Sequence, residues 1–92
     1  KNKILKRYAL LIDKDISFDS IRECAIKSER NLLKNINLFD VYTGDKLPKD
    51  KKSYAVSFTL QDEKKTLTDK QIDKIMKKLQ QNFEKDFGAT LR

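Results

Sequence analysis

The stretch 38–59, LFDVYTGDKLPKDKKSYAVSFT, decides the architecture of this 92-residue chain. It alternates in polarity at both ends, and its middle carries the only proline and one of the two glycines. That pattern is typical of two strands joined by a hairpin loop, here 44–51. We expect Asp40, Tyr42 and Ser53 to project from its solvent face. An acid, an aromatic ring and a hydroxyl beside lysines suit the binding of an unpaired base.

The two strands of this hairpin differ in regularity. The strand before the loop, 33–43, changes phase, because its apolar residues move from one parity to the other after Leu38. A change of phase within a strand predicts a bulge, here near 38–39, which would turn the candidate residues outward. A register that pairs Tyr42 with Ser53 then puts Asp40 opposite Ala55, so that the candidates share one face. The strand after the loop alternates cleanly, with its apolar face formed by Tyr54, Val56, Phe58 and Leu60.

The part of the chain before the hairpin predicts a strand and a helix. Residues 5–13 are apolar on both parities, which favours a central strand. Ser17 and Ser20 are both plausible N-caps of a following helix that reaches about Arg30, and Ser20 with Glu23 matches a capping box. The apolar face of this helix comprises Ile21, Cys24, Ala25 and Ser28.

The part after the hairpin predicts a second helix and a short last strand. Thr68 with Gln71 forms a capping box, and Gly88 is placed to end the helix. Residues 89–92 are the last strand candidate. The order β-α-β-β-α-β predicts a ferredoxin-like α+β fold for one domain, 1–92, with a four-stranded antiparallel sheet and both helices on one face. The second helix is expected to bury an apolar stripe, which consists of Ile72, Ile75, Met76, Leu79 and Phe83.

Composition narrows the functional classes. The net charge is +7, and excess lysine favours an acidic partner, most often nucleic acid. Lys51 and Lys52 flank the candidate face and are expected to contact RNA phosphates. The single Cys24 excludes an internal disulfide and a multi-cysteine metal site, and its place on an apolar helix face indicates a buried hydrophobe. Without histidine, a glycine-rich phosphate loop or paired carboxylates, a catalytic role finds no support.

The chain carries no targeting or membrane segment that the sequence reveals. No apolar run approaches the roughly 20 residues of a membrane span, and there is no signal peptide, so we expect a cytoplasmic location and no membrane partner. The chain begins at Lys1, and its only methionine is Met76. We therefore expect a fragment that performs part of the function of a larger protein.

Two other functions remain open for an α+β domain of this kind. In the first, the open sheet face binds protein, as in a ligand-sensing or oligomerising module; a face rich in Leu, Ile and Val would favour it. Polar residues of the last hairpin strand, Ser57 and Thr59 among them, oppose it. In the second, the domain carries a metal, but the chain lacks the Cys-x-x-Cys motif for a soft metal.

Five ordered motifs make the chain resemble a known family. They are ALLIDK at 9–14, LFDVYTG at 38–44, LPKDKKS at 47–53, TLTD at 66–69 and FGATLR at 87–92. Together they resemble the ferredoxin-fold anticodon-binding domain at the C-terminus of the bacterial-type phenylalanyl-tRNA synthetase β subunit. The resemblance covers nearly the whole chain.

The resemblance implies a role in binding the anticodon loop of phenylalanine tRNA. It implies that Tyr42 stacks on the first anticodon base, a guanine, and that Asp40 and Ser53 help to recognise that base. It also implies a parent enzyme that uses ATP and Mg²⁺ bound outside this domain and pairs with an α subunit. The family's Arg-Asp pair at the start of the first strand is Lys6-Arg7 here. Lys6 keeps a cation that can face a phosphate, whereas any role of the aspartate is lost.

Overall fold

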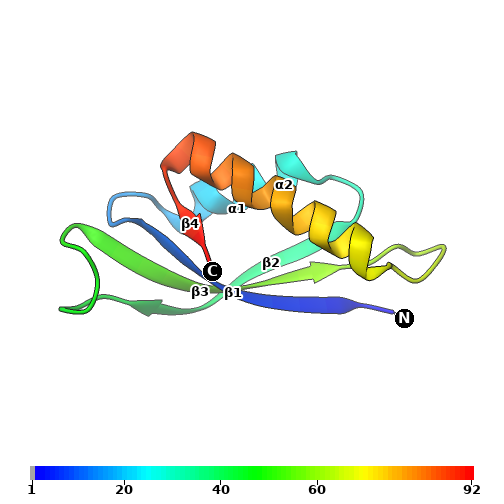
Figure 1. Cartoon of the computed structure of the whole chain (residues 1–92), viewed down its shortest axis with the longest axis horizontal. Coiled ribbons are helices and arrows are strands. Elements are labelled where there is room, and N and C mark those ends of the chain that lie inside the picture. The colour runs from blue at the N-terminus through cyan, green and yellow to red at the C-terminus, as the bar shows by residue number, and fades with distance from the viewer. Residues whose placement is uncertain (1) are drawn as a thin grey trace.

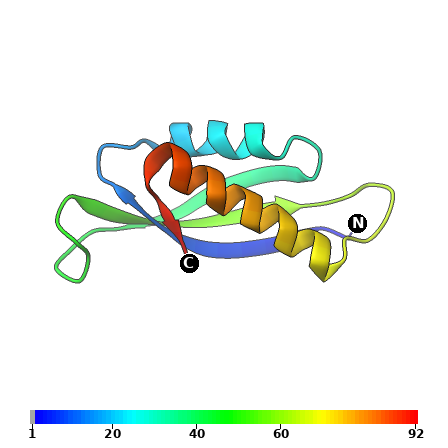
Figure 2. The same ribbon diagram turned by 45° about the horizontal axis from the view of Figure 1, so that its top comes forward.

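Four antiparallel strands form one sheet in the order β2-β3-β1-β4, and both helices cover the same face of it (Figures 1 and 2). This computed structural model describes residues 2–92. The expected ferredoxin-like arrangement is confirmed. The elements are β1 (Ile4–Asp13), α1 (Phe18–Ser28), β2 (Leu33–Tyr42), β3 (Lys51–Leu60), α2 (Asp69–Phe87) and β4 (Thr90–Leu91).

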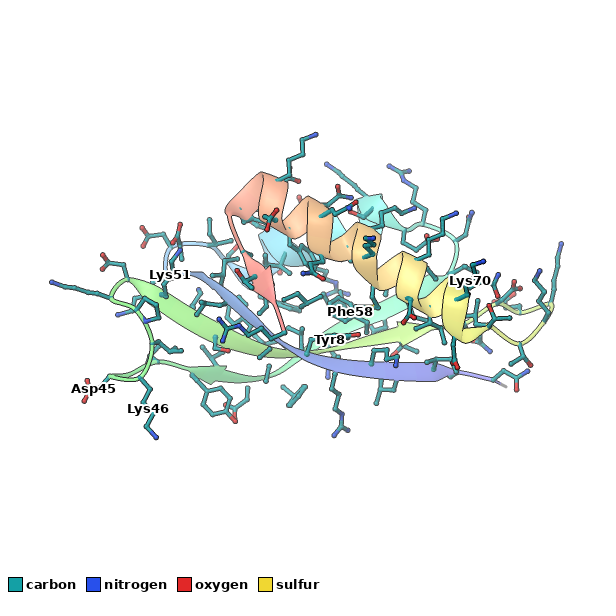
Figure 3. The ribbon with its side chains drawn as sticks, viewed as in Figure 1. Tyr8, Asp45, Lys46, Lys51, Phe58 and Lys70 are labelled. Atoms are coloured by element: carbon teal, nitrogen blue, oxygen red, sulfur yellow. The ribbon has the colours of Figure 1, made fainter. Side chains whose placement is uncertain are left out.

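The core lies between the sheet and the two helices. Phe58 projects from the inner strand β3 toward α2 and is fully buried (Figure 3). Its ring centroid lies 6.3 Å from that of Phe83 and 6.1 Å from that of Tyr8, so aromatic contacts join both inner strands to α2. The expected apolar stripes of both helices are confirmed. The largest fully buried side chains are Phe58, Phe83, Leu10, Ile12, Ile21, Leu60, Leu79 and Val56.

Cys24 belongs to this core. It is 8% exposed, and its thiol donates a hydrogen bond to Oδ2 of Asp86 on α2 at 3.5 Å. Burial first, and then this hydrogen bond, raise the pKa of the thiol above its usual 9.0, which keeps it protonated at neutral pH. The interpretation of Cys24 as a buried hydrophobe is therefore confirmed.

The ends of α2 lie where the sequence predicts them, whereas both ends of α1 need a correction. In α2, Thr68 and Gln71 form the expected capping box, and Gly88 ends the helix with a left-handed φ of 62°. In α1 the N-cap is Ser17, whose side chain accepts from the backbone N–H of Ser20 at 3.3 Å. A capping box at Ser20 is therefore wrong. The helix also stops at Ser28, two residues earlier than predicted.

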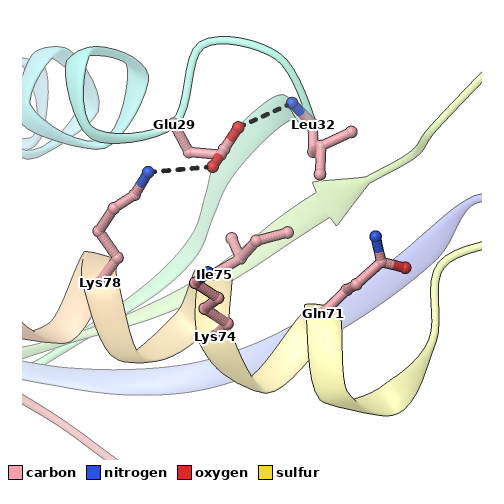
Figure 4. Close-up of a pocket in the computed structure, with 6 residues that line it drawn as sticks. All are labelled: Glu29, Leu32, Gln71, Lys74, Ile75 and Lys78. Atoms are coloured by element: carbon pink, nitrogen blue, oxygen red, sulfur yellow. Dashed lines mark hydrogen bonds and ion pairs between the residues drawn. The ribbon is translucent and has the colours of Figure 1, made fainter.

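Glu29 stabilises the connection between α1 and β2 through hydrogen bonds. Its carboxylate accepts from the backbone N–H of Leu32 at 3.1 Å and lies 3.3 Å from the ammonium of Lys78 (Figure 4). It also accepts from the backbone N–H of Asn31 at 3.2 Å. Burial alone would raise the pKa of Glu29, but these contacts outweigh it and hold the pKa below its usual 4.5. A cavity of about 300 Å³ lies between this connection and α2. It is lined by Glu29, Leu32, Gln71, Lys74, Ile75 and Lys78.

Glu29→Gln should lower the free energy of unfolding by about 1 kcal/mol at neutral pH, because the amide loses charge-assisted hydrogen bonds. Since the folded-state pKa is lowered, the charged form stabilises the fold above about pH 4.5, and this contribution disappears as the pH falls through the folded-state pKa. Urea unfolding of both proteins over a pH series measures the effect. The difference should shrink below about pH 4.5; a constant difference would show that the charge contributes nothing.

Candidate nucleic-acid interface

The sheet face that the helices leave open carries the predicted cluster. Tyr42 pairs opposite Ser53 and Asp40 opposite Ala55, as expected from the sequence. The register shifts between Leu38 and Asp40, which confirms the predicted bulge. Because paired residues in neighbouring strands project to the same side, the carboxylate, the phenol ring and the hydroxyl lie close together. The arrangement rests on the β2–β3 hairpin, whose loop extends beyond the helices (Figure 1).

Tyr42 offers a free ring beside an oriented carboxylate. Its side chain is 56% exposed, so a ring face is open to a stacking partner. A hydrogen bond to the Asp40 carboxylate, followed by the negative charge of that group, raises the pKa of Tyr42 above its usual 10.0. The Asp40 carboxylate also accepts from the backbone N–H of Val41 at 2.8 Å, through Oδ1. The backbone N–H of Val41 thus orients Asp40, and a carboxylate with about four acceptor sites retains capacity for a ligand.

The structure separates the two lysines that the sequence placed beside this cluster. Lys51 shares the parity of Ser53 and belongs to the open face, where its ammonium pairs with Oδ1 of Asp13 at 2.6 Å. Lys52 has the opposite parity. Its ammonium donates to the carbonyl of Lys14 at 2.8 Å and lies 4.5 Å from the ring centroid of Tyr54. Only Lys51 therefore stands on the same face as Asp40 and Tyr42.

Lys6 also falls on the other face. It shares the parity of Tyr8 and Leu10, which face the helices. The cation that β1 contributes to the open face is its neighbour Arg7, opposite Ser57 of β3. Of the six predicted site residues, the structure thus brings together Asp40, Tyr42, Ser53 and Lys51, and it leaves Lys6 and Lys52 apart from them.

Three further exposed residues on the open face could not be assigned from the sequence patterns used above. Phe39, the extra residue of the bulge, is 53% exposed, and the guanidinium of Arg7 lies 5.6 Å from its ring centroid. Leu5 is 52% exposed on the same face, so this surface is more apolar than the serines and threonine of β3 suggested. The parity of β1, counted from Ala9 opposite Ala55, could have identified Arg7 and Leu5 once β1 was paired with β3.

The described part of the chain offers neither a metal site nor a membrane-spanning helix. Within residues 2–92, no group of three or more His, Cys, Asp or Glu side chains could hold a metal ion. Neither helix in that range is long and apolar enough to cross a membrane. The open face is therefore the candidate site that the described residues support best.

Fold and site define an α+β domain that presents exposed aromatic and polar side chains on an uncovered sheet. Residues 3–92 match the model of the ferredoxin-fold anticodon binding domain, and the chain belongs to this family.

Curated relatives support the same assignment. The chain is 57% identical over 84 residues to the phenylalanine–tRNA ligase β subunit of Bacteroides fragilis. The aligned residues make up 91% of this chain and 10% of the Bacteroides subunit. The corresponding subunit of Porphyromonas gingivalis is 49% identical over 98% of this chain and 11% of its own length. The β subunit of Clostridium acetobutylicum is 38% identical, over 97% of this chain and 11% of its own length. The chain thus spans about a tenth of the length of these relatives.

Proposed function

We propose that this chain is a tRNA-binding module of a phenylalanine–tRNA ligase and that its open face holds the anticodon loop of phenylalanine tRNA. Family membership and the names of the relatives support a role in tRNA binding. The observation that carries the proposal is the exposed ring of Tyr42, with a carboxylate and a hydroxyl beside it on an uncovered sheet.

The chemistry of these groups fits an unpaired guanine. The ring of Tyr42 provides a stacking surface, and stacking of a base on an aromatic side chain is worth about 1–3 kcal/mol. The carboxylate of Asp40 accepts hydrogen bonds, as the N–H groups on the pairing edge of guanine require. The hydroxyl of Ser53 both donates and accepts. Lys51 and Arg7 supply positive charge on the same face for the phosphates.

The parent phenylalanine–tRNA ligase would perform the attachment of phenylalanine to tRNA. In this proposal the module is non-catalytic, and ATP and Mg²⁺ bind elsewhere in a cytoplasmic ligase that also contains an α subunit. The module then positions tRNA for phenylalanyl transfer. Its own contribution is binding free energy and selection of the anticodon.

The alternative of a protein-binding face has some support in the exposed Leu5 and Phe39. Two features favour RNA over this alternative. Two of the large exposed groups of the face, Phe39 and Tyr42 on β2, are aromatic, and the guanidinium of Arg7 lies beside the ring of Phe39. The chain as a whole carries a net charge of +7, which favours a polyanion.

Titration of the chain with the anticodon stem-loop of phenylalanine tRNA tests the proposal. We expect tighter binding of this stem-loop than of one with a scrambled loop, and an affinity that falls as salt rises, because phosphate contacts release counterions. NMR detection allows weak binding to be measured. Equal affinity for both loops would contradict anticodon selection. An absence of RNA binding together with self-association of the chain would support the protein-binding alternative instead.

A further inference from the structure

Phe39 and Arg7 form an exposed pair on the open face that the proposed contact with one base at Tyr42 does not use. Phe39 keeps about half of its side chain exposed, at 53%, although it lies in a strand of the sheet. Arg7 comes from β1, two strands away, and its guanidinium lies 5.6 Å from the ring centroid. Both groups can stack on a nucleobase, the aromatic through its ring and the guanidinium through its plane.

The bulge explains why Phe39 is available. A bulge adds one residue to a strand and re-aims its side chain, here between Leu38 and Asp40. Without the extra residue, the alternation that buries Ile36 and Leu38 would place either Phe39 or Tyr42, but not both, on the open face. The local distortion therefore gives one strand two aromatic side chains on the same side of the sheet.

The surroundings of the pair leave room for a flat ligand. Ala55 lies opposite Asp40 in β3, and Ala9 lies opposite Ala55 in β1, so the sheet carries only methyl groups there. Larger side chains stand on either side of this row, with Tyr42 toward the hairpin and Arg7 toward the other end. These small residues of β3 and β1, beside the exposed side chains of β2, form a shallow platform on which a base can lie.

The spacing indicates how many bases the platform takes. Phe39 lies three positions before Tyr42, which corresponds to at most about 10 Å along a strand. Bases stacked on one another lie about 3.4 Å apart. Two bases that stack on these two rings therefore cannot also stack on each other. They must be splayed apart, as bases can be in an unpaired loop.

We propose that Phe39 and Arg7 form a second base-stacking site, which takes the unpaired nucleotide next to the one on Tyr42. This inference rests on the proposed function, and it predicts that the open face holds at least two consecutive splayed nucleotides. Stacking tolerates any base, so the second site contributes affinity more than selectivity. The charge of Arg7 also attracts the phosphate between the two nucleotides.

The test uses the 92-residue chain and anticodon stem-loops that carry the fluorescent base 2-aminopurine at one loop position at a time. Phe39→Ala should weaken binding by about 5- to 160-fold, which is the stacking free energy converted to a ratio of dissociation constants. It should also abolish quenching of 2-aminopurine at one position, adjacent to the position that Tyr42→Ala affects. Arg7→Lys keeps the charge but not the plane, so it should preserve the salt dependence and reduce the quenching.

Val41→Ala is the matched control. Val41 is also exposed, at 46%, and lies in the same strand, but it pairs with Tyr54 and has the parity of the other face. We expect its affinity and quenching to equal those of the wild type. If Phe39→Ala behaves like Val41→Ala while Tyr42→Ala weakens binding, the second site is refuted and the proposed function stands. If neither aromatic substitution changes binding, both proposals fail.

Discussion

Phe58→Ala should lower the free energy of unfolding by about 3–5 kcal/mol, the range expected when a fully buried aromatic side chain is deleted. Phe58 has no exposed surface, and it contacts rings from β1 and α2. Its removal would open a cavity at the point where both layers meet. Urea unfolding followed by circular dichroism measures the change. Because domains of this size are stable by only about 5–15 kcal/mol, the variant should be close to the limit of folding.

Phe39→Ala is the matched control for this prediction. It removes the same ring from the open face, where more than half of the side chain is exposed and the stated contact is with Arg7. We expect a loss below about 1 kcal/mol. Similar losses in the two variants would contradict the assignment of the core to the helix side of the sheet.

The hairpin could be predicted from the sequence because its signals are local. The clean alternation of β3, the proline and glycine in the loop, and the change of phase before it together determine the register that pairs Tyr42 with Ser53. The capping box of α2 is equally local, since Thr68 and Gln71 lie three residues apart. The loop residues Asp45 and Lys46 lie at the tip that results (Figure 3).

The start of α1 could not be predicted, because two serines offered equivalent caps. The choice of Ser17 makes Phe18 the first helical residue. Phe18 then packs against Tyr54 of β3, with ring centroids 5.9 Å apart. This contact joins residues 36 positions apart in the chain, and no local pattern reveals it.

The cations of the site were assigned incompletely for a similar reason. A strand that is apolar on both parities gives no indication of which side faces the helices, so Lys6 and Arg7 could not be distinguished. Only the pairing of β1 with β3 places Arg7 opposite Ser57 on the open face. Adjacent lysines in a strand must point to opposite sides, which separates Lys51 from Lys52. The alternation of a strand thus predicts that only one of these two lysines can lie on the open face.

Tyr42→Ala should weaken binding of the phenylalanine anticodon stem-loop by about 1–3 kcal/mol, because it removes the ring on which the first anticodon base is proposed to stack. The fold should remain intact, since the ring is 56% exposed. Asp40→Asn should act differently. It keeps the shape but replaces one acceptor oxygen with a donor amide, so it should reduce the preference for guanine more than the total affinity.

The most direct measurement is the affinity of the wild type, Tyr42→Ala and Asp40→Asn for two stem-loops that differ only at the first anticodon base, guanine in one and uridine in the other. We predict that the wild type prefers guanine, that Tyr42→Ala weakens binding of both loops, and that Asp40→Asn narrows the difference between them. Unchanged affinities of both variants for both loops would contradict the claim that this face reads the anticodon.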